Sequence, residues 1–268
     1  MGHSQTYSAA KLTVTHTCLT CSTGASSGIG EACACQFAAA GANVIIAARR
    51  LDRLEAVQTK IQGNWPKVQV LAIELNVRNR EDVERAIAGI PGELADIDIL
   101  VNNAGLAMGV DPVSDIGDEA IDTVIDTNIK GLLYVSRAVV RIMKRRGSGH
   151  IIMMGSIAGM AGYANGSIYC ATKSAVHSIS ESLRAETISI PIKVTEIKPG
   201  MVETEFSVVR YHGDKDKADN VYRGMEPMTA DDVAESVVFA ASRHPRCVVS
   251  EVVLLATGQA SATLVHRE

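Results

Sequence analysis

The chain of 268 residues is 47% hydrophobic, 4% aromatic and 21% charged, with a net charge of -4. This length predicts one large α/β domain with a substantial core rather than two small domains. The slightly acidic balance argues against a nucleic-acid or membrane-surface protein, and no apolar run approaches the roughly 20 residues of a membrane-spanning helix. Because the N-terminus also lacks a secretory signal pattern, we expect a soluble cytoplasmic protein with no nucleic-acid or membrane partner.

The N-terminal residues and the cysteines each allow two interpretations. Residues 1–12 are expected to be a flexible leader, in which Gly2 and Thr6 match a loose myristoylation pattern that a disordered lead-in explains equally well. Four of the six cysteines are close in sequence, with spacings that also occur in zinc sites. Cys33 and Cys35, however, fall in a predicted helix, where neighbours two apart point in different directions. We therefore favour small buried thiols and predict no metal site.

Short apolar segments alternate with helical patterns over residues 13–268, which we expect to form a single domain. Strands are predicted at residues 14–22, 43–48, 68–75, 97–101, 149–155, 193–197 and 251–256. Helices are predicted at residues 31–40, 51–62, 81–90, 118–146 and 231–242, with another that carries Tyr169 and ends near residue 189. Residues 203–223 are expected to be a polar, irregular insertion. The alternation predicts a doubly wound, seven-stranded parallel sheet with helices on both faces and a site at the carboxyl ends of the strands.

A glycine-rich loop lies between the first predicted strand and the first predicted helix, with the sequence T-G-A-S-S-G-I-G at residues 23–30. Gly24 permits a tight turn, while Gly28 and Gly30 let the backbone approach a pyrophosphate and the helix pack on the sheet. The free N–H groups at the helix start then face the phosphates. The spacing is not G-x-G-x-x-G and the loop alone also suits a plain turn, but its position predicts nucleotide binding.

The end of the second predicted strand indicates which nucleotide binds. A ribose 2′-hydroxyl calls for an acidic residue there, whereas a 2′-phosphate calls for arginine. The chain has Arg49 and Arg50 at this point and no acid before Asp52. Because the guanidinium fork pairs well with phosphate, the sequence favours NADP over NAD. The alternative is that both arginines only begin a solvated helix.

Three side chains form a candidate catalytic group. Tyr169 and Lys173 are four residues apart, so on a helix they share one face. A nearby ammonium lowers the pKa of a phenol, and Ser156, just after a predicted strand, could hold a substrate oxygen against that phenol. The arrangement suits proton transfer to or from an alcohol oxygen. A Tyr and a Lys at this spacing also occur on many ordinary helix surfaces.

Taken together, these motifs resemble the short-chain dehydrogenase/reductase family. The resemblance rests on the glycine loop, N-N-A-G at residues 102–105, Asn128, Ser156, Y-C-A-T-K at residues 169–173 and P-G at residues 199–200, in the family's order and spacing. It spans residues 14–257 and implies a Rossmann fold, an NADP cofactor and a reversible hydride transfer at a CH–OH group.

The resemblance also implies a role for each matched residue. Tyr169 is the expected general acid/base, and Lys173 lowers its pKa and holds the nicotinamide ribose. Ser156 positions the substrate oxygen, and Asn128 holds a water that relays protons. Asn76 departs from the Asp common in the family, although its amide oxygen can still accept a hydrogen bond from adenine. The expected cofactor-binding residues are Gly24, Ser26, Ser27, Gly28, Ile29, Gly30, Arg49, Arg50, Asn76, Val77, Asn103, Ala104, Gly105, Tyr169, Lys173, Pro199, Gly200, Val202 and Thr204.

The substrate is expected to contact a loop over about residues 200–226. This stretch resembles a subgroup that oxidises small 3-hydroxy acids such as serine, allo-threonine, 3-hydroxypropionate and 3-hydroxyisobutyrate with NADP. Arg210 is a candidate clamp for the substrate carboxylate, and Glu203 could meet a substrate ammonium. Both could equally be solvated loop charges.

Two other functions remain open from the sequence. One is an NADPH-dependent reductase of uncharged ketones or 3-oxoacyl thioesters, and the other is a non-catalytic NADP-binding protein. The apolar faces of the helix at residues 118–146 and of the helix carrying Tyr169 suggest pairing between subunits. We therefore expect a homo-oligomer, a tetramer by resemblance.

Overall fold

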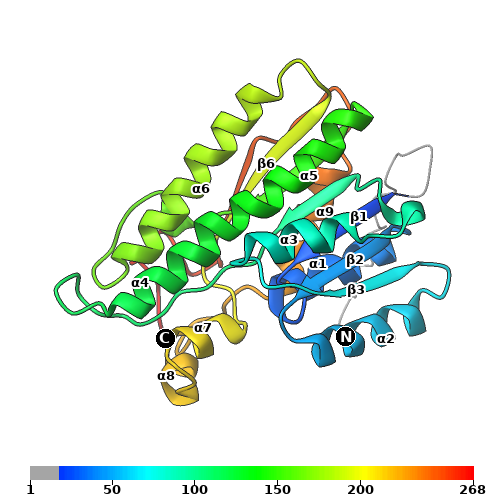
Figure 1. Ribbon diagram of the computed structural model, residues 1–268. Coiled ribbons are helices and arrows are strands. Elements are labelled where there is room, and N and C mark those ends of the chain that lie inside the picture. Colours follow the sequence, from blue (N-terminus) through cyan, green and yellow to red (C-terminus); the bar gives the residue numbers. More distant parts are fainter. Residues whose placement is uncertain (1–17) are drawn as a thin grey trace.

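The computed structural model describes residues 18–268 and shows them as a sheet covered by helices on both faces (Figure 1). Within these residues the sheet has seven strands, all parallel, in the order β3-β2-β1-β4-β5-β6-β7. The predicted doubly wound fold is therefore confirmed. The strands are β1 (Leu19–Thr23), β2 (Asn43–Ala48), β3 (Val70–Glu74), β4 (Ile99–Asn102), β5 (Gly149–Met154), β6 (Ile192–Pro199) and β7 (Glu251–Leu254).

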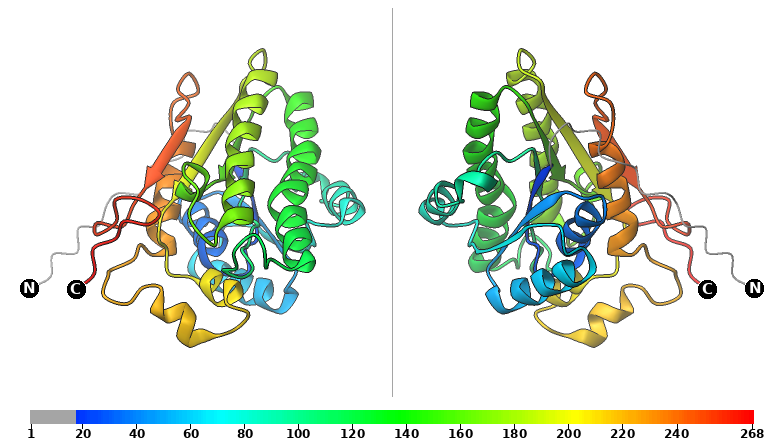
Figure 2. Two further views of the ribbon diagram at one scale, coloured as in Figure 1. Left: turned by 90° about the vertical axis from the view of Figure 1, so that its left-hand side faces the viewer. Right: turned by 90° about the vertical axis from the view of Figure 1, so that its right-hand side faces the viewer.

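The helices form two layers, one on each face of the sheet (Figure 2). The core on one face includes side chains of α1 (Gly28–Ala39), α2 (Leu51–Asn64) and α9 (Ala230–Ala241). The core on the other face includes side chains of α3 (Arg80–Ala88), α5 (Leu132–Arg146) and α6 (Ser167–Glu186). Because the chain turns to opposite sides of β1, a crevice opens at the carboxyl ends of β1 and β4. Within the described residues, no helix is long and apolar enough to cross a bilayer.

The first strand is short and polar, and its polar side chains support the neighbouring loops. Ser22 Oγ donates to the carbonyl of Gly30 at 3.0 Å, which ties the strand to the start of α1. Thr23 Oγ1 accepts hydrogen bonds from the amides of Asn103 and Ala104, both at 3.1 Å. The buried hydroxyls of Ser22 and Thr23 are tolerated because they have partners. The predicted leader, the myristoylation pattern and residues 14–17 of the predicted strand lie outside the described residues.

Residues 118–146 form one continuous helix, as predicted, but its middle is not α-helical. The segments are α4 (Asp118–Ile125), a π-helical stretch (Asp126–Gly131) and α5. A Cβ added at Gly131 would lie 2.8 Å from a methyl carbon of Val77, so the helix packs very closely on the loop after β3. π-Helical turns occur frequently at functional sites, and Asn128 lies inside this one.

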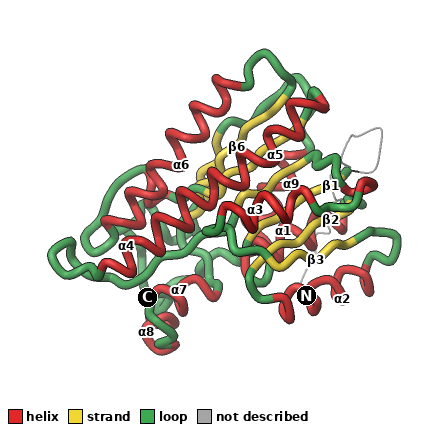
Figure 3. Tube along the Cα trace, viewed as in Figure 1, coloured by secondary structure: helices red, strands yellow, loops and turns green. Residues whose placement is uncertain are grey.

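The predicted irregular insertion contains two short helices, α7 (Glu205–Arg210) and α8 (Lys215–Asn220). Thr204 Oγ1 accepts a hydrogen bond from the amide of Phe206, and Asp214 Oδ1 accepts one from the amide of Lys217. These caps satisfy amides at the helix starts, which explains why a polar segment becomes ordered. Figure 3 shows α7 and α8 at one end of the molecule, apart from the helices that cover the sheet.

His150 and several cysteines are buried titratable side chains of the fold. His150, near the start of β5, is 3% exposed, and its Nε2 lies 2.8 Å from Thr195 Oγ1. Burial, with a smaller contribution from Lys193, lowers the pKa of His150 to about 3. Several cysteines are buried and all six are free. Burial raises the pKa of Cys21 to about 12, so this thiol stays protonated at neutral pH.

Candidate active site

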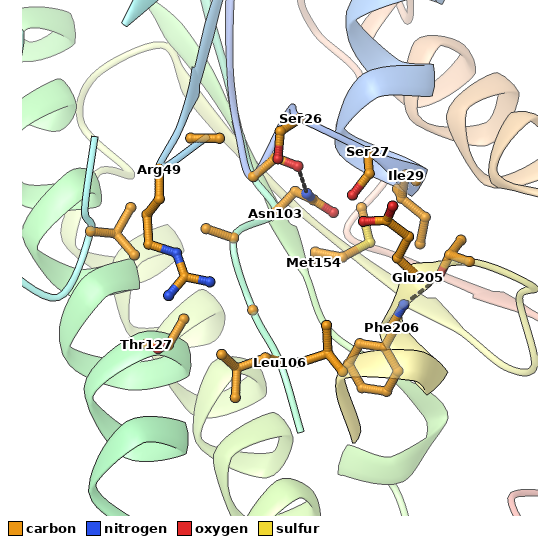
Figure 4. A pocket seen from close by; sticks show the side chains of 18 of the residues that line it. Ser26, Ser27, Ile29, Arg49, Asn103, Leu106, Thr127, Met154, Glu205 and Phe206 are labelled. Carbon is orange, nitrogen blue, oxygen red and sulfur yellow. Dashed lines mark hydrogen bonds between the residues drawn. The ribbon is translucent and has the colours of Figure 1, made fainter. Parts of the chain in front are cut away.

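One cleft of about 330 Å³ lies at the carboxyl ends of the strands. Apart from Gly30, which packs beneath the turn, every residue that the sequence predicted to bind the cofactor lines this cleft. Its walls come from the loops after β1 to β6 and from the first residues of α7. Figure 4 shows some of these side chains, with the β1–α1 turn and α7 on the same side of the cleft. The predicted motifs are therefore brought together by the fold.

The β1–α1 turn leaves space for a ligand because its glycines bring backbone close to backbone. A Cβ at Gly30 would lie 2.5 Å from the carbonyl oxygen of Gly24, which no side chain permits. Gly24 has a φ of 65°, in the left-handed region that favours glycine. Asn103 Nδ2 donates to the carbonyl of Thr23 at 2.9 Å and fixes the turn from the neighbouring strand. The turn therefore presents the start of α1 to the cleft, where its free amides suit a phosphate.

The two arginines after β2 have different surroundings. The side chain of Arg49 extends into the cleft toward Thr127 (Figure 4), and among residues 18–268 it has no hydrogen-bonding partner. Arg50 instead donates to Ser26 Oγ and Ser27 Oγ, both at 3.0 Å, and to Glu205 at 2.9 Å. Arg49 is thus free to bind an anion, whereas Arg50 joins the glycine turn to α7.

The predicted adenine contact is partly engaged within the protein. The side-chain oxygen of Asn76 accepts a hydrogen bond from the amide of Arg78 at 3.2 Å. A carbonyl oxygen has a second lone pair, so the same atom can still accept from a base. Val77, next in the chain, is buried against the π-helical segment and lines the cleft.

The three candidate catalytic side chains meet at the inner end of the cleft. Ser156 is 8% exposed, and its Oγ donates to the carbonyl of Pro199 at 3.3 Å and accepts from the amide of Ala158 at 3.1 Å. Lys173 is 6% exposed and donates to the carbonyl of Met154 at 2.7 Å. Its ammonium lies 5.8 Å from the centre of the Tyr169 ring. β5 and α6 therefore bring Ser156, Tyr169 and Lys173 to one place, as the sequence predicted.

The electrostatics of this group differ from the expectation. Burial raises the pKa of Tyr169, and the nearby Ser156 hydroxyl works in the opposite direction without reversing it. Burial also lowers the pKa of Lys173 to about 8, while the charge of Glu196 works in the opposite direction. The expectation of a Tyr169 pKa lowered by Lys173 is wrong for this structure, because desolvation outweighs every attraction on the phenolate. Tyr169 is a neutral phenol here.

Asn128 uses its side chain to hold the fold around the cleft. Its Oδ1 accepts from the amide of Leu106 at 2.9 Å, and its Nδ2 donates to the carbonyl of Leu106 at 2.8 Å and to Thr172 Oγ1 at 3.1 Å. The π-helical segment is thereby joined to the loop after β4 and to α6. With these bonds made, the side chain positions its neighbours, and a role in proton relay stays a prediction.

The predicted substrate residues separate in space. Arg210 lines a second, smaller cavity that shares Tyr169 with the main cleft. Its guanidinium donates to the carbonyl of Gly109 at 3.4 Å and to the Tyr163 hydroxyl at 3.3 Å. Glu203, by contrast, is exposed and lines neither cavity. The prediction for Glu203 is therefore not supported, because the chain turns at Thr204 and α7 begins beyond it.

Several residues around the site were missed by the sequence reasoning. Asp111 lines the smaller cavity, which no pattern in the sequence indicated. Phe206 packs on Tyr169 with 5.4 Å between ring centres. Glu205 pairs with Arg50 and also with Arg53. These contacts join residues far apart in the sequence, such as Arg50 and Glu205, so no local pattern reveals them. The cap at Thr204, four residues before the pair Val208-Val209, was a usable signal for α7.

Comparisons with known proteins agree with this geometry. A model of the short chain dehydrogenase family matches residues 18–214. An NADP-dependent 3-hydroxy acid dehydrogenase of Schizosaccharomyces pombe is 43% identical over 92% of this chain and 95% of its own length. A serine 3-dehydrogenase of Rhizobium radiobacter is 36% identical over 92% of this chain and 97% of its own length. A solved structure of a closed serine dehydrogenase with NADP+ has a TM-score of 0.87 at 39% identity and covers 93% of this chain and 100% of its own.

Proposed function

Because the chain belongs to the short-chain dehydrogenase family, we propose that it transfers a hydride between NADP and the 3-hydroxyl or 3-oxo group of a small hydroxy acid. The proposed substrates are serine, allo-threonine and 3-hydroxypropionate. The observation that carries the proposal is that a glycine turn, two arginines and the Ser156–Tyr169–Lys173 group share one cleft. The names of the relatives at 36–43% identity support the same class of reaction.

The residues at the outer part of the cleft fit NADP. The β1–α1 turn lines the cleft, and its close packing at Gly30, where a Cβ would meet backbone atoms, brings the start of α1 within reach of a pyrophosphate. The unpartnered guanidinium of Arg49 matches a ribose 2′-phosphate in charge and in its planar fork of donors. Lys173, deep in the cleft, is placed to hold the nicotinamide ribose. When bound, NADP accepts or supplies the hydride.

The inner residues handle the proton. In reduction, Tyr169 donates its proton to the substrate oxygen, and in oxidation the phenolate takes it back. The raised pKa of Tyr169 keeps the proton on the phenol until a substrate oxygen is present. Ser156 Oγ would turn its hydrogen from the carbonyl of Pro199 to the same oxygen, and the charge of Lys173 would stabilise the phenolate that forms. Each of the three side chains thus has one role in the proposed proton transfer.

The smaller cavity supplies charges for the rest of the substrate. Arg210 is half-buried beside Tyr169, and a guanidinium is a strong partner for a carboxylate. Asp111 lines the same cavity, and within residues 18–268 its carboxylate has no hydrogen bond or ion pair. In place of Glu203, we propose Asp111 as the partner of a substrate ammonium. A substrate with both groups, such as serine, would use both residues.

A substrate panel tests the proposal directly. NADP+ reduction is followed with L-serine, L-allo-threonine, 3-hydroxypropionate, 3-hydroxyisobutyrate and matched neutral secondary alcohols. We expect kcat/KM at least tenfold higher for the acids, since one charge-assisted hydrogen bond is worth about 1.5–3 kcal/mol. Equal or higher values for the neutral alcohols would favour a reductase of uncharged ketones instead.

The proposal extends to assembly and location. We propose a homo-oligomer, a tetramer by resemblance, because β7 is an edge strand of the sheet in residues 18–268, and Val253 on it, Leu255 just after it and Leu133 on α5 are exposed. Light scattering after gel filtration measures the mass, and a monomer at micromolar concentration would contradict the proposal. A cytoplasmic location stays a prediction from composition, tested by fractionation.

A further inference from the structure

Glu196 is a buried acid that the proposed reaction does not use. It lies on β6, is 1% exposed, and its side chain is on the face covered by α6. Its Oε2 lies 2.8 Å from Nδ1 of His177 and 3.3 Å from the ammonium of Lys198. Its Oε1 is buried and has no hydrogen-bonding partner among the described residues. A buried carboxylate oxygen without a partner is costly, which indicates a function for its charge.

The unpartnered oxygen lies beside Gly155, the residue before the catalytic Ser156. A Cβ added at Gly155 would lie 2.3 Å from Glu196 Oε1, so the carboxylate fills the space where a side chain would be. Gly155 lies between Met154, whose carbonyl accepts from Lys173 at 2.7 Å, and Ser156. His177 is also one helical turn after Lys173, on the same face of α6. The carboxylate therefore lies under the stretch of α6 that carries Lys173 and His177.

The other charges near Glu196 largely neutralise one another. Lys198 donates to Glu251 at 2.8 Å, and His177 Nε2 lies 3.6 Å from Glu181. Arg184 on α6 donates to the carbonyls of Val194 and Ser250, and its charge is one of several that lower the pKa of Glu251. His177, Glu196 and Glu251 hold ligand atoms within 4.8 Å of one another, as a metal site does, but the ammonium of Lys198 lies among them. In this cluster the ammonium of Lys198 therefore supplies the positive charge that a metal ion would otherwise supply.

We propose that Glu196 is a positioning residue for the reaction, whose buried carboxylate is the countercharge that keeps Lys173 protonated in the cleft. Lys173 is buried, and a buried ammonium without a countercharge loses its proton readily. Burial does lower the pKa of Lys173 to about 8, and Glu196 is the group that opposes this. Gly155 is then a glycine because the carboxylate needs its space. The proposal rests on the proposed function, in which a charged Lys173 holds the ribose and stabilises the phenolate.

The test measures NADPH binding against pH in Glu196→Gln, with Glu251→Gln as the matched control. NADPH fluorescence gives Kd from pH 6 to 9 without turnover, so it does not depend on the substrate. In Glu196→Gln we expect the pKa of Lys173 to fall by about one unit. Affinity would therefore weaken with rising pH about one unit earlier than in the wild type, so that it is about fivefold lower than the wild-type affinity at pH 8. Glu251→Gln, which removes an acid bonded to Lys198, should keep the wild-type profile.

The outcomes separate a charge role from a purely structural one. A loss of affinity that is uniform with pH, or an equal shift in Glu251→Gln, would overturn the proposal. If Glu196→Gln does not fold, Glu196→Asp moves the carboxylate one methylene away, and a smaller shift in the same direction is expected. An unshifted profile in the variant that folds would also overturn it. If the wild type binds NADPH but oxidises no hydroxy acid, the proposed substrate fails while this test still stands.

Discussion

The two walls of the cleft are built in different ways. The cofactor wall consists of short turns at the ends of strands, held by backbone contacts and by side chains from neighbouring strands, such as Thr23 and Asn103. The substrate wall includes α7, six residues long, whose side chains bond to distant parts of the chain. Glu205, for example, accepts from Arg50 at 2.9 Å, and Arg210 donates to the carbonyl of Gly109 at 3.4 Å.

This difference has a physical cause. A pyrophosphate is recognised by amides and by an approach that only glycine allows, so its site is encoded in a few consecutive residues. A small hydroxy acid is recognised by separate charged side chains, which any part of the chain can supply. The cofactor wall is therefore local in sequence, whereas the substrate wall is a product of tertiary structure. Variants in the two walls should consequently fail in different ways.

The largest effect is expected at Tyr169, which lines both cavities. Tyr169→Phe removes the hydroxyl that donates the proton, and general acid catalysis contributes about 10²–10⁴-fold. We expect kcat to fall by about 10³-fold, while NADPH binding measured by fluorescence changes little. Activity within tenfold of the wild type would show that another group moves the proton.

The cofactor wall is tested by Arg49→Asp. The change removes a guanidinium from the cleft and places a carboxylate where a 2′-phosphate is expected. Loss of a charge-assisted contact worth about 1.5–3 kcal/mol, with added repulsion, should lower the preference of kcat/KM for NADP over NAD by about 100-fold. KM for the hydroxy acid should stay near the wild-type value. Arg53→Asp makes the same change of charge outside the cleft and is the control for a general charge effect.

The substrate wall is tested by Arg210→Ala. KM for 3-hydroxypropionate should rise about 10- to 50-fold, because a carboxylate loses a charge-assisted partner. KM for NADP+ and for a neutral alcohol should change less than threefold. Asp111→Asn provides a second comparison, since it should raise KM for serine about tenfold and leave KM for 3-hydroxypropionate unchanged. Equal losses on acids and neutral alcohols in Arg210→Ala would mean that Arg210 holds α7 in place through Gly109 and Tyr163 rather than binding substrate.

What could be predicted from the sequence follows the same division. The sheet, its helices and the cofactor residues were predictable because apolar periodicity and the glycine spacing are local signals. The π-helical turn around Asn128 was not, because its cause is the tight packing of Gly131 on Val77. Nor was the raised pKa of Tyr169, which depends on how deeply the tertiary fold buries the phenol. Glu203 was misplaced because a charge in a loop carries no information about which way the chain turns.

The burial of His150 makes the stability of the fold depend on pH. The folded protein holds this ring neutral, with its pKa lowered to about 3, whereas an unfolded chain protonates it near pH 6.5. The unfolded state therefore binds one more proton between these values, so stability is complete above about pH 6.5 and falls as the solution becomes more acidic. The expected slope is about 1.4 kcal/mol of unfolding free energy per pH unit. Urea titrations at pH 7 and pH 5 should show this loss, and His150→Gln should lose less. The strand whose far end leads into Ser156 therefore also limits how acidic a solution the enzyme withstands.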